Sequence, residues 1–305
     1  MMNRRTFSKT LAGGTLGTAA LARAPLAAAA PAAMNSSPAE SPFKISVMLW
    51  TVFHGLPFEQ RLEKVAEAGY HAVQLVTEAS TWTDDEFRRY NKKRAELGIT
   101  FDTTCSVGPG AGDPSGREAF LAGVRQSLII MDKLECPKLI VMSGNVVPGL
   151  SPEAQHASCV EGMKRAAELV EGKGLTLLLE NIDLEENPHY YMWSIPEAFK
   201  IIEEVNHPQA KVLYDFYHAQ ISGGNLISNL EKHIDKAGLF HIADVPGRHQ
   251  PGTGEINYIN IYKKLGELNY HGYVAMEFFP TGDPIKILAA ARQEALQAAQ
   301  QKRSA

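Results

Sequence analysis

From residue 43 onward the chain alternates short β-prone runs with helical patterns at a nearly constant spacing. Eight β-prone runs fall between residues 43 and 280, or about 30 residues for each strand–helix unit. Such regular alternation is typical of a parallel sheet whose strands are joined by crossover helices. The eight runs cover residues 44–51, 72–76, 100–107, 138–143, 175–181, 211–218, 239–245 and 272–279.

Amphipathic stretches between these runs predict the helices. They cover residues 59–68, 118–134, 152–172, 196–205 and 284–302. Eight units, and no GxGxxG after the first run, favour a closed barrel over a doubly wound sheet. We therefore predict an α/β fold, a single (β/α)8 TIM barrel over residues 43–305, with its active site at the carboxyl ends of the strands.

The first 34 residues differ in composition from the rest of the chain. Residues 10–22 are uncharged and number 13, fewer than the ~20 needed to span a bilayer. A basic start, a short apolar stretch and small residues after it predict an export signal at 1–34, followed by a linker at 35–42. The charged residues of the segment are all basic: Arg4, Arg5, Lys9 and Arg23.

The consecutive arginines of this segment resemble a twin-arginine signal. That resemblance implies the twin-arginine export machinery as a partner, a periplasmic location, and a chain that folds before export. A disordered basic tail or an uncleaved anchor is the alternative. Three cysteines without a CxxC pair predict neither a disulfide framework nor a cysteine zinc site.

Net charge argues against a nucleic-acid partner. The chain carries 30 basic and 34 acidic residues, a net charge of −4. Without the first 34 residues, 26 basic residues remain against 34 acidic ones, and the net charge becomes −8. An extended basic surface is therefore not expected on the barrel.

Four potential metal ligands occur at the ends of four consecutive predicted strands. They are Glu180, Asp215, His241 and Glu277, separated by 35, 26 and 36 residues. Ionised groups in apolar strands are costly unless they are paired or coordinated. Three carboxylates and one imidazole suit Mn²⁺, Mg²⁺ or Co²⁺ better than a thiolate-type zinc site. The alternative is that each acid is a separate ion-paired or capping group.

Several motifs resemble the hydroxypyruvate isomerase family of xylose-isomerase-like TIM barrels, to which the ketose 3-epimerases are related. The most specific is HIADVPGRHQPGTGEINY at residues 241–258, supported by DFYHAQ at 215–220 and SVMLWT at 46–51. The resemblance covers about residues 43–280. It implies that Glu180, Asp215, His241 and Glu277 bind the metal and that Glu180 and Glu277 also act as acid and base.

The resemblance also implies a reaction and a substrate class. The reaction is proton transfer next to a carbonyl through an enediolate, as in conversion of hydroxypyruvate to tartronate semialdehyde. Members of the family can carry glutamine where this chain has His241, and histidine is the choice of ketose epimerases. A ketose 3-epimerase or another sugar isomerase therefore stays open, as does an exported sugar-binding protein without catalysis. A DNA-repair endonuclease of the same superfamily is disfavoured by the acidic charge.

Other residues near the predicted strand ends gain roles from the resemblance. It implies that His218, Arg248 and Glu186 bind a small keto acid or sugar. Asp244 is expected either to support His241 or to shape a turn. The aromatic loop 187–193 is expected either to cap the pocket or to form a contact in a homo-oligomer.

Overall fold

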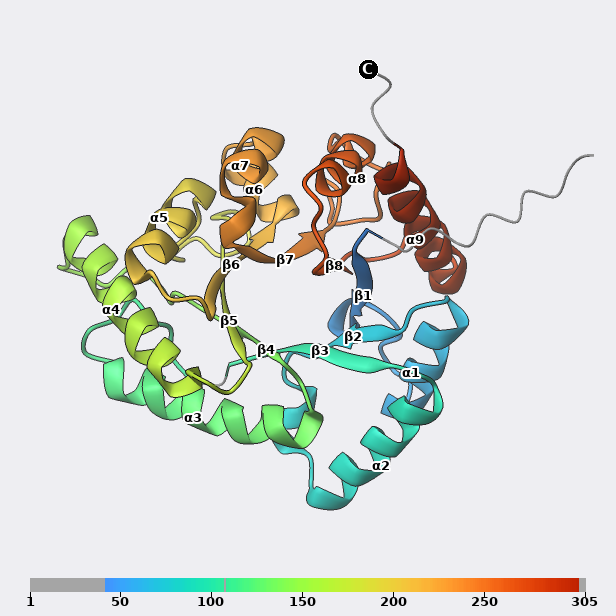
Figure 1. The fold of residues 1–305 in the computed structure, drawn as a ribbon, viewed down its shortest axis with the longest axis horizontal. Helices are drawn as coiled ribbons and strands as arrows, with labels where there is room; N and C mark the ends of the chain where they lie inside the picture. Colours follow the sequence, from blue (N-terminus) through green and yellow to red (C-terminus); the bar gives the residue numbers. More distant parts are fainter. Residues whose placement is uncertain (1–41, 107, 302–305) are drawn as a thin grey trace, which may run out of the picture. The chain divides into compact units, whose positions relative to one another are not determined.

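A computed structural model describes residues 42–106 and 108–301, and eight parallel strands in it close into a barrel in chain order. β1 pairs with both β2 and β8, so the sheet has no free edge, and helices surround the strands (Figure 1). The predicted single TIM barrel is confirmed. The strands are β1 (Lys44–Met48), β2 (Ala72–Gln74), β3 (Thr100–Cys105), β4 (Lys138–Val141), β5 (Thr176–Glu180), β6 (Ala210–Asp215), β7 (Ala237–Ile242) and β8 (Tyr273–Met276).

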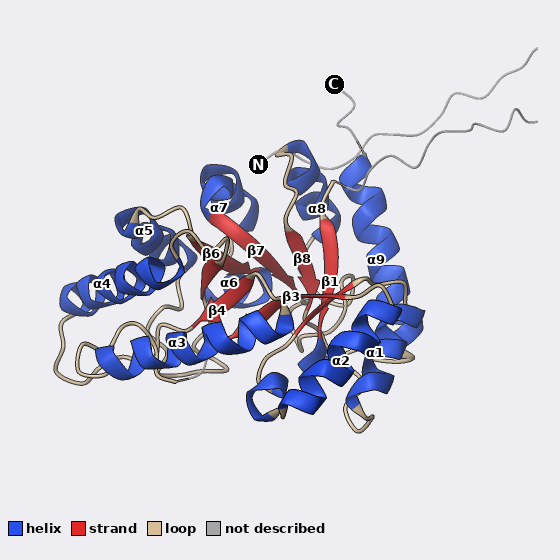
Figure 2. Cartoon of the chain, turned by 60° about the horizontal axis from the view of Figure 1, so that its bottom comes forward, coloured by secondary structure: helices blue, strands red, loops and turns tan. Residues whose placement is uncertain are grey.

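Helices cover the outside of the strands, as Figure 2 shows. The α-helices are α1 (Phe58–Glu67), α2 (Asp84–Glu96), α3 (Arg117–Leu134), α4 (Pro152–Val170), α5 (Ile195–Val205), α6 (Phe216–Ser222), α7 (Leu226–His233), α8 (Tyr258–Glu267) and α9 (Pro284–Gln300). Short 3₁₀ turns are η1 (Leu49–Thr51), η2 (Glu78–Thr81) and η3 (Ile234–Lys236). The sequence patterns did not single out α2, α6, α7 or α8.

All eight predicted strands run past the observed carboxyl ends. The clearest error is the sixth, predicted to reach residue 218, because β6 ends at Asp215 and α6 follows at once. The Asp215 side chain causes this change, since its Oδ1 accepts the N–H groups of Tyr217 and His218 and caps the new helix. His218 therefore lies in the first turn of a helix and not on a strand. Glu277 likewise follows β8 by one residue.

Inside the barrel, apolar side chains form a layer beneath the carboxyl ends of the strands. Leu178, Leu213 and Leu239 pack there together with Met48 and Ile140. Each of the three leucines lies two positions before a predicted metal ligand on the same strand. Because side chains alternate between the two faces of a strand, these ligands form the next layer up.

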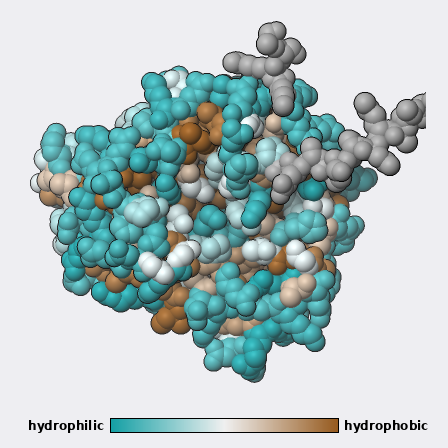
Figure 3. All heavy atoms as spheres, viewed as in Figure 1, coloured by the Kyte–Doolittle hydropathy of each residue, from teal (hydrophilic) through white to brown (hydrophobic). Residues whose placement is uncertain are grey.

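On the face drawn in Figure 3, the periphery formed by the helices is mostly hydrophilic, and apolar side chains gather in small patches. Within residues 42–106 and 108–301, no helix is both long and apolar enough to cross a bilayer. The predicted signal segment 1–34 and residues 35–41 of the predicted linker lie outside the described residues.

An ion-paired histidine joins two of the outer helices. His156 of α4 contacts Glu197 of α5 at 2.6 Å through Nδ1 and Glu204 of α5 at 3.0 Å through Nε2. Burial alone would lower the pKa of His156, but the two glutamates outweigh that effect and raise it. Because the folded pKa lies above the unfolded one, the stabilisation is complete below about pH 6.5 and is lost as the pH rises through the folded pKa.

We therefore predict that His156→Gln destabilises the protein by about 1 kcal/mol near pH 6 and by less near pH 9. Urea unfolding of the wild type and the variant at both pH values measures this difference. Glu204→Gln, which removes one of the two partners, is expected to show a smaller effect of the same sign. A destabilisation that is the same at both pH values would contradict the ion-pair account.

Candidate metal centre and active site

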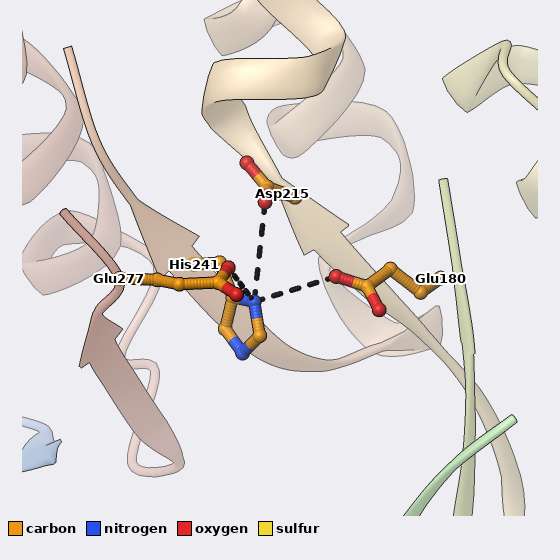
Figure 4. A group of neighbouring side chains, drawn as sticks. All are labelled: Glu180, Asp215, His241 and Glu277. Carbon is orange, nitrogen blue, oxygen red and sulfur yellow. Dashed lines mark ion pairs between the residues drawn. The ribbon is translucent and has the colours of Figure 1, made fainter. Parts of the chain in front are cut away.

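Four side chains meet at the carboxyl ends of β5 to β8, and we call them the strand-end cluster: Glu180, Asp215, His241 and Glu277. One ligand atom from each lies within 4.8 Å of the others, and all four residues are buried. His241 Nδ1 lies 2.6 Å from Glu277 Oε2, 3.4 Å from Glu180 Oε1 and 3.9 Å from Asp215 Oδ2. Figure 4 shows the three carboxylates directed at this one nitrogen. The structure thus brings together all four predicted metal ligands.

Strand register places the cluster. Asp215 and His241 are direct partners in the ladder between β6 and β7, so their side chains start at the same height. The backbone N–H of Glu277 donates to Ile242 and continues the ladder beyond β8. Asn181, which the sequence did not single out, accepts the N–H of Asp215 through Oδ1 and donates through Nδ2 to the Asp215 carbonyl. These bonds hold the ends of β5 and β6 together.

The carboxylates create a strong demand for positive charge in this buried space. Burial alone would lower the pKa of His241, but Glu277 and Glu180 raise it to about 10. Burial alone would raise the pKa of Glu277, yet His241, Arg248 and a hydrogen bond from Trp50 hold it well below its ordinary value. Burial raises the pKa of Asp215. The centre is therefore one in which cations and protons compete for the same oxygens.

The other nitrogen of His241 faces away from the carboxylates. Its Nε2 lies 2.8 Å from Oε1 of Gln74, whose Nε2 donates in turn to Asp102 at 3.0 Å. Neither Gln74 nor Asp102 is predictable from the sequence, because single polar residues on β2 and β3 carry no motif. Of the two roles expected for Asp244, the structure supports the turn, since this side chain bonds only to backbone N–H groups.

The cluster fits a divalent cation by two observations. His241 Nδ1, Asp215 Oδ2 and Glu277 Oε2 are buried and face one another, yet none forms a well-oriented hydrogen bond. Buried polar atoms nearly always form hydrogen bonds. Here three of them meet only through ion-pair contacts with one another and with the neighbouring Arg248, and a cation between them would satisfy all three. The donor set of three carboxylates and one imidazole is also one that binds divalent cations.

A second set of side chains adjoins the cluster, and we call it the Arg248 group: Asp183, Glu186, His218 and Arg248. Arg248 Nη1 lies 2.8 Å from Glu186 Oε2, and Nη2 lies 3.0 Å from Glu277 Oε2. His218 is bonded to Asp183 through Nδ1, while its Nε2 lies 3.3 Å from Arg248 Nη1. The three residues predicted to bind substrate therefore lie together beside the cluster.

The loop after β7 holds Arg248 in place. Asp244 organises this loop because its two carboxylate oxygens accept four backbone N–H groups. These N–H groups belong to Val245, Gly252, Gly254 and Ile256. Arg248 itself has a φ of 55°, in the left-handed region, and its guanidinium packs over the rings of Trp50 and Tyr217. Only 6% of Arg248 is exposed, so its charge is directed inward.

Aromatic residues complete the walls of the site. Trp50 donates its indole N–H to Glu277 Oε1 at 2.8 Å. Tyr190 of the loop 187–193 is buried, and its hydroxyl accepts the N–H of Ser143 and donates to the carbonyl of Glu180. This tyrosine therefore joins the loops after β4 and β5.

Burial raises the pKa of Cys105 well above its ordinary value, which agrees with a structural role for this thiol.

The structure is therefore a closed (β/α)8 barrel with three carboxylates and a histidine gathered at its strand ends. The chain belongs to the xylose isomerase-like TIM barrel family, whose model matches residues 62–300. Relatives over most of its length are named isomerases, so the protein is an enzyme of the isomerase class.

Two curated relatives illustrate this membership. Hydroxypyruvate isomerase of Escherichia coli is 30% identical over 243 residues, which cover 78% of this chain and 93% of the relative. 2-Oxo-tetronate isomerase of Haemophilus influenzae is 30% identical over 256 residues, which cover 79% and 95%. The expected family resemblance is thereby confirmed.

Two solved structures show the same architecture. One, described as an AP endonuclease of family 2 from Brucella melitensis, superposes with a TM-score of 0.75 at 27% identity and covers 83% of this chain and 98% of its own. The other, a D-psicose 3-epimerase, superposes with a TM-score of 0.67 at 21% identity and covers 84% and 96%. The second likeness extends to the fold alone.

If the strand-end cluster binds a cation, the cation will stabilise the fold. At a concentration of about 100 times the dissociation constant we expect a gain of about 2.7 kcal/mol, or a rise in Tm of about 5–10 °C. Thermal unfolding with and without Mn²⁺, Mg²⁺ or Co²⁺ measures it. Asp215→Asn should remove the rise, whereas Glu255→Gln, a carboxylate outside the cluster, should leave it. An equal rise in the Asp215 variant would place the cation elsewhere.

Proposed function

We propose that the protein is a metal-dependent isomerase that moves a proton next to a carbonyl group, with hydroxypyruvate or a close hydroxy-keto acid as its substrate. One observation carries this proposal: Glu180 and Glu277 lie on either side of His241 Nδ1, beside the buried guanidinium of Arg248. The names of the curated relatives support the substrate class.

The proposed reaction includes a bound divalent metal ion. Glu180, Asp215, His241 and Glu277 would hold it, and the hard donor set favours Mn²⁺, Mg²⁺ or Co²⁺. When bound, a divalent cation supplies Lewis acidity that stabilises negative charge on substrate oxygens.

The residues of the chain account for the proton movements. One carboxylate of the Glu180 and Glu277 pair removes a proton from the CH₂OH carbon of hydroxypyruvate. The C–H electron pair forms the C2–C3 double bond, and the carbonyl oxygen gains the negative charge of an enediolate. Protonation at C2 and transfer of the C3 hydroxyl proton to the C2 oxygen then give tartronate semialdehyde. Arg248 and Trp50, which contact Glu277, keep that carboxylate ionised and oriented.

The Arg248 group would orient the substrate. A guanidinium binds carboxylates through two parallel hydrogen bonds, which suits the acid group of a keto acid. His218 is held by Asp183 and directs Nε2 towards Asp215 and Arg248, where a substrate hydroxyl would lie. Glu186 pairs with Arg248 and would contact another hydroxyl.

A ketose 3-epimerase or another sugar isomerase is the second candidate function. The same two carboxylates would exchange a proton at a sugar carbon next to the carbonyl. His241 favours this reading, because the resemblance identifies histidine at that position with ketose epimerases. A sugar-binding protein without catalysis is the candidate of another class.

Solvent proton exchange separates these functions. We expect the wild type with Mn²⁺ to incorporate deuterium from D₂O into hydroxypyruvate, and NMR measures the rate of this exchange. Glu180→Gln or Glu277→Gln is expected to lower that rate about 10²–10⁴-fold. Glu185 is an exposed residue of the loop that follows β5, so Glu185→Gln is the matched control and should retain the exchange rate. Exchange into ketoses but not hydroxypyruvate would favour the epimerase, and exchange into neither would favour a binding protein.

We also propose that residues 1–34 form a twin-arginine signal that directs the folded enzyme to the periplasm. The support is the basic, apolar and small-residue order of this segment. In an exporting bacterium we expect the full chain in the periplasmic fraction and the Arg4→Lys, Arg5→Lys double variant in the cytoplasm. Arg23→Lys is the matched control. Export of the double variant at the wild-type level would refute this route.

A further inference from the structure

A buried chain of hydrogen bonds extends from the strand-end cluster to the opposite wall of the barrel. It runs from His241 on β7 through Gln74 at the end of β2 to Asp102 on β3, and all three residues are fully buried. The His241–Gln74 bond connects β7 with β2, which are not neighbours in the sheet, whereas Gln74 and Asp102 lie on the paired strands β2 and β3. None of these contacts is needed to close the barrel.

Acceptors at the far end determine which way the Gln74 amide faces. Gln74 Nε2 lies 3.0 Å from Asp102 Oδ2 and 3.4 Å from Thr103 Oγ1. The Thr103 hydroxyl donates to the same Asp102 oxygen at 2.9 Å and so offers Gln74 only a lone pair. An ionised carboxylate accepts but does not donate. Gln74 must therefore direct its NH₂ towards Asp102 and its Oε1 towards His241.

The orientation of Gln74 determines in turn which nitrogen of His241 carries a proton. Gln74 Oε1 can only accept, so His241 Nε2 must be an N–H donor across the 2.8 Å contact. Nδ1 is the nitrogen that faces the three carboxylates, and it can then present a lone pair to a cation. The reverse amide orientation would make Nε2 the acceptor and place a proton on Nδ1, which excludes coordination there.

We propose that Gln74 and Asp102 are positioning residues that hold His241 in the tautomer required of a metal ligand. Outer partners of metal-bound histidines are usually carboxylates or carbonyls that act directly on the ring. Here the Asp102 carboxylate contacts the Gln74 amide, and the Gln74 amide contacts the His241 ring. This inference rests on the proposed metal centre but does not depend on which substrate the enzyme isomerises.

Titration calorimetry of the full chain with Co²⁺, together with the visible absorption of the bound Co²⁺, tests the proposal. Gln74→Met keeps the size of the side chain and removes its acceptor, and we expect about 10–100-fold weaker binding and an altered Co²⁺ spectrum. Gln155→Met is the matched control. Gln155 is equally buried, but its amide bonds only to the backbone of Asn145 and Val147, so affinity should stay at the wild-type value.

A second pair of variants keeps the test decisive if Gln74→Met is unstable. Asp102→Asn alone should weaken Co²⁺ binding, because an amide at this position no longer dictates the orientation of Gln74. Adding Gln74→Glu should restore most of the lost affinity. The new carboxylate accepts from His241 Nε2, and the new amide at position 102 donates to that carboxylate.

Three results have different meanings. If Gln74→Met and Asp102→Asn bind Co²⁺ as tightly as Gln155→Met, or the double variant is no better than Asp102→Asn, the positioning role is wrong. If the wild type binds no cation, both the metal centre and the positioning role are overturned. If the affinities follow the expected order but the wild type isomerises nothing, the positioning role stands and the proposed function fails.

Discussion

Three buried carboxylates that converge on one imidazole nitrogen are the constraint around which the rest of the site is arranged. Like charges this close in a buried space repel strongly and lose their hydration, so positive charge must lie among them. His241 and Arg248 supply part of it within the chain. The loop that orients Arg248 and the hydrogen bonds behind His241 both serve this requirement. A divalent cation would meet it more completely.

The alternation of side chains along the barrel strands provides this arrangement. Every second residue faces the interior, so each strand offers an apolar side chain to one layer and a ligand to the next. Leu213 and Asp215, or Leu239 and His241, are such pairs. Asp215 has a second task, because one of its oxygens caps α6 while the other faces the cluster. One side chain thus ends a strand, starts the helix that carries His218 and contributes to the centre.

The sequence predicted the closed barrel and the residues of the cluster, because spacing along the chain maps directly onto neighbouring strands. It did not predict Gln74, Asp102 or Asn181, whose partners lie 28 to 167 positions away. The contact of Gln74 with His241 also depends on barrel closure. The β-prone residues that follow Asp215 also led to a predicted sixth strand that extends to His218. In the structure Asp215 caps a helix at that point. Periodicity shows which face a residue occupies. It does not show which side chain across the barrel that residue meets.

Anomalous diffraction from crystals of the protein grown with Mn²⁺ tests the central claim most directly. The account predicts one strong anomalous peak within coordination distance of Glu180, Asp215, Glu277 and Nδ1 of His241, with Nε2 of His241 still bonded to Gln74. Peaks only at surface carboxylates, or coordination through Nε2, would contradict it.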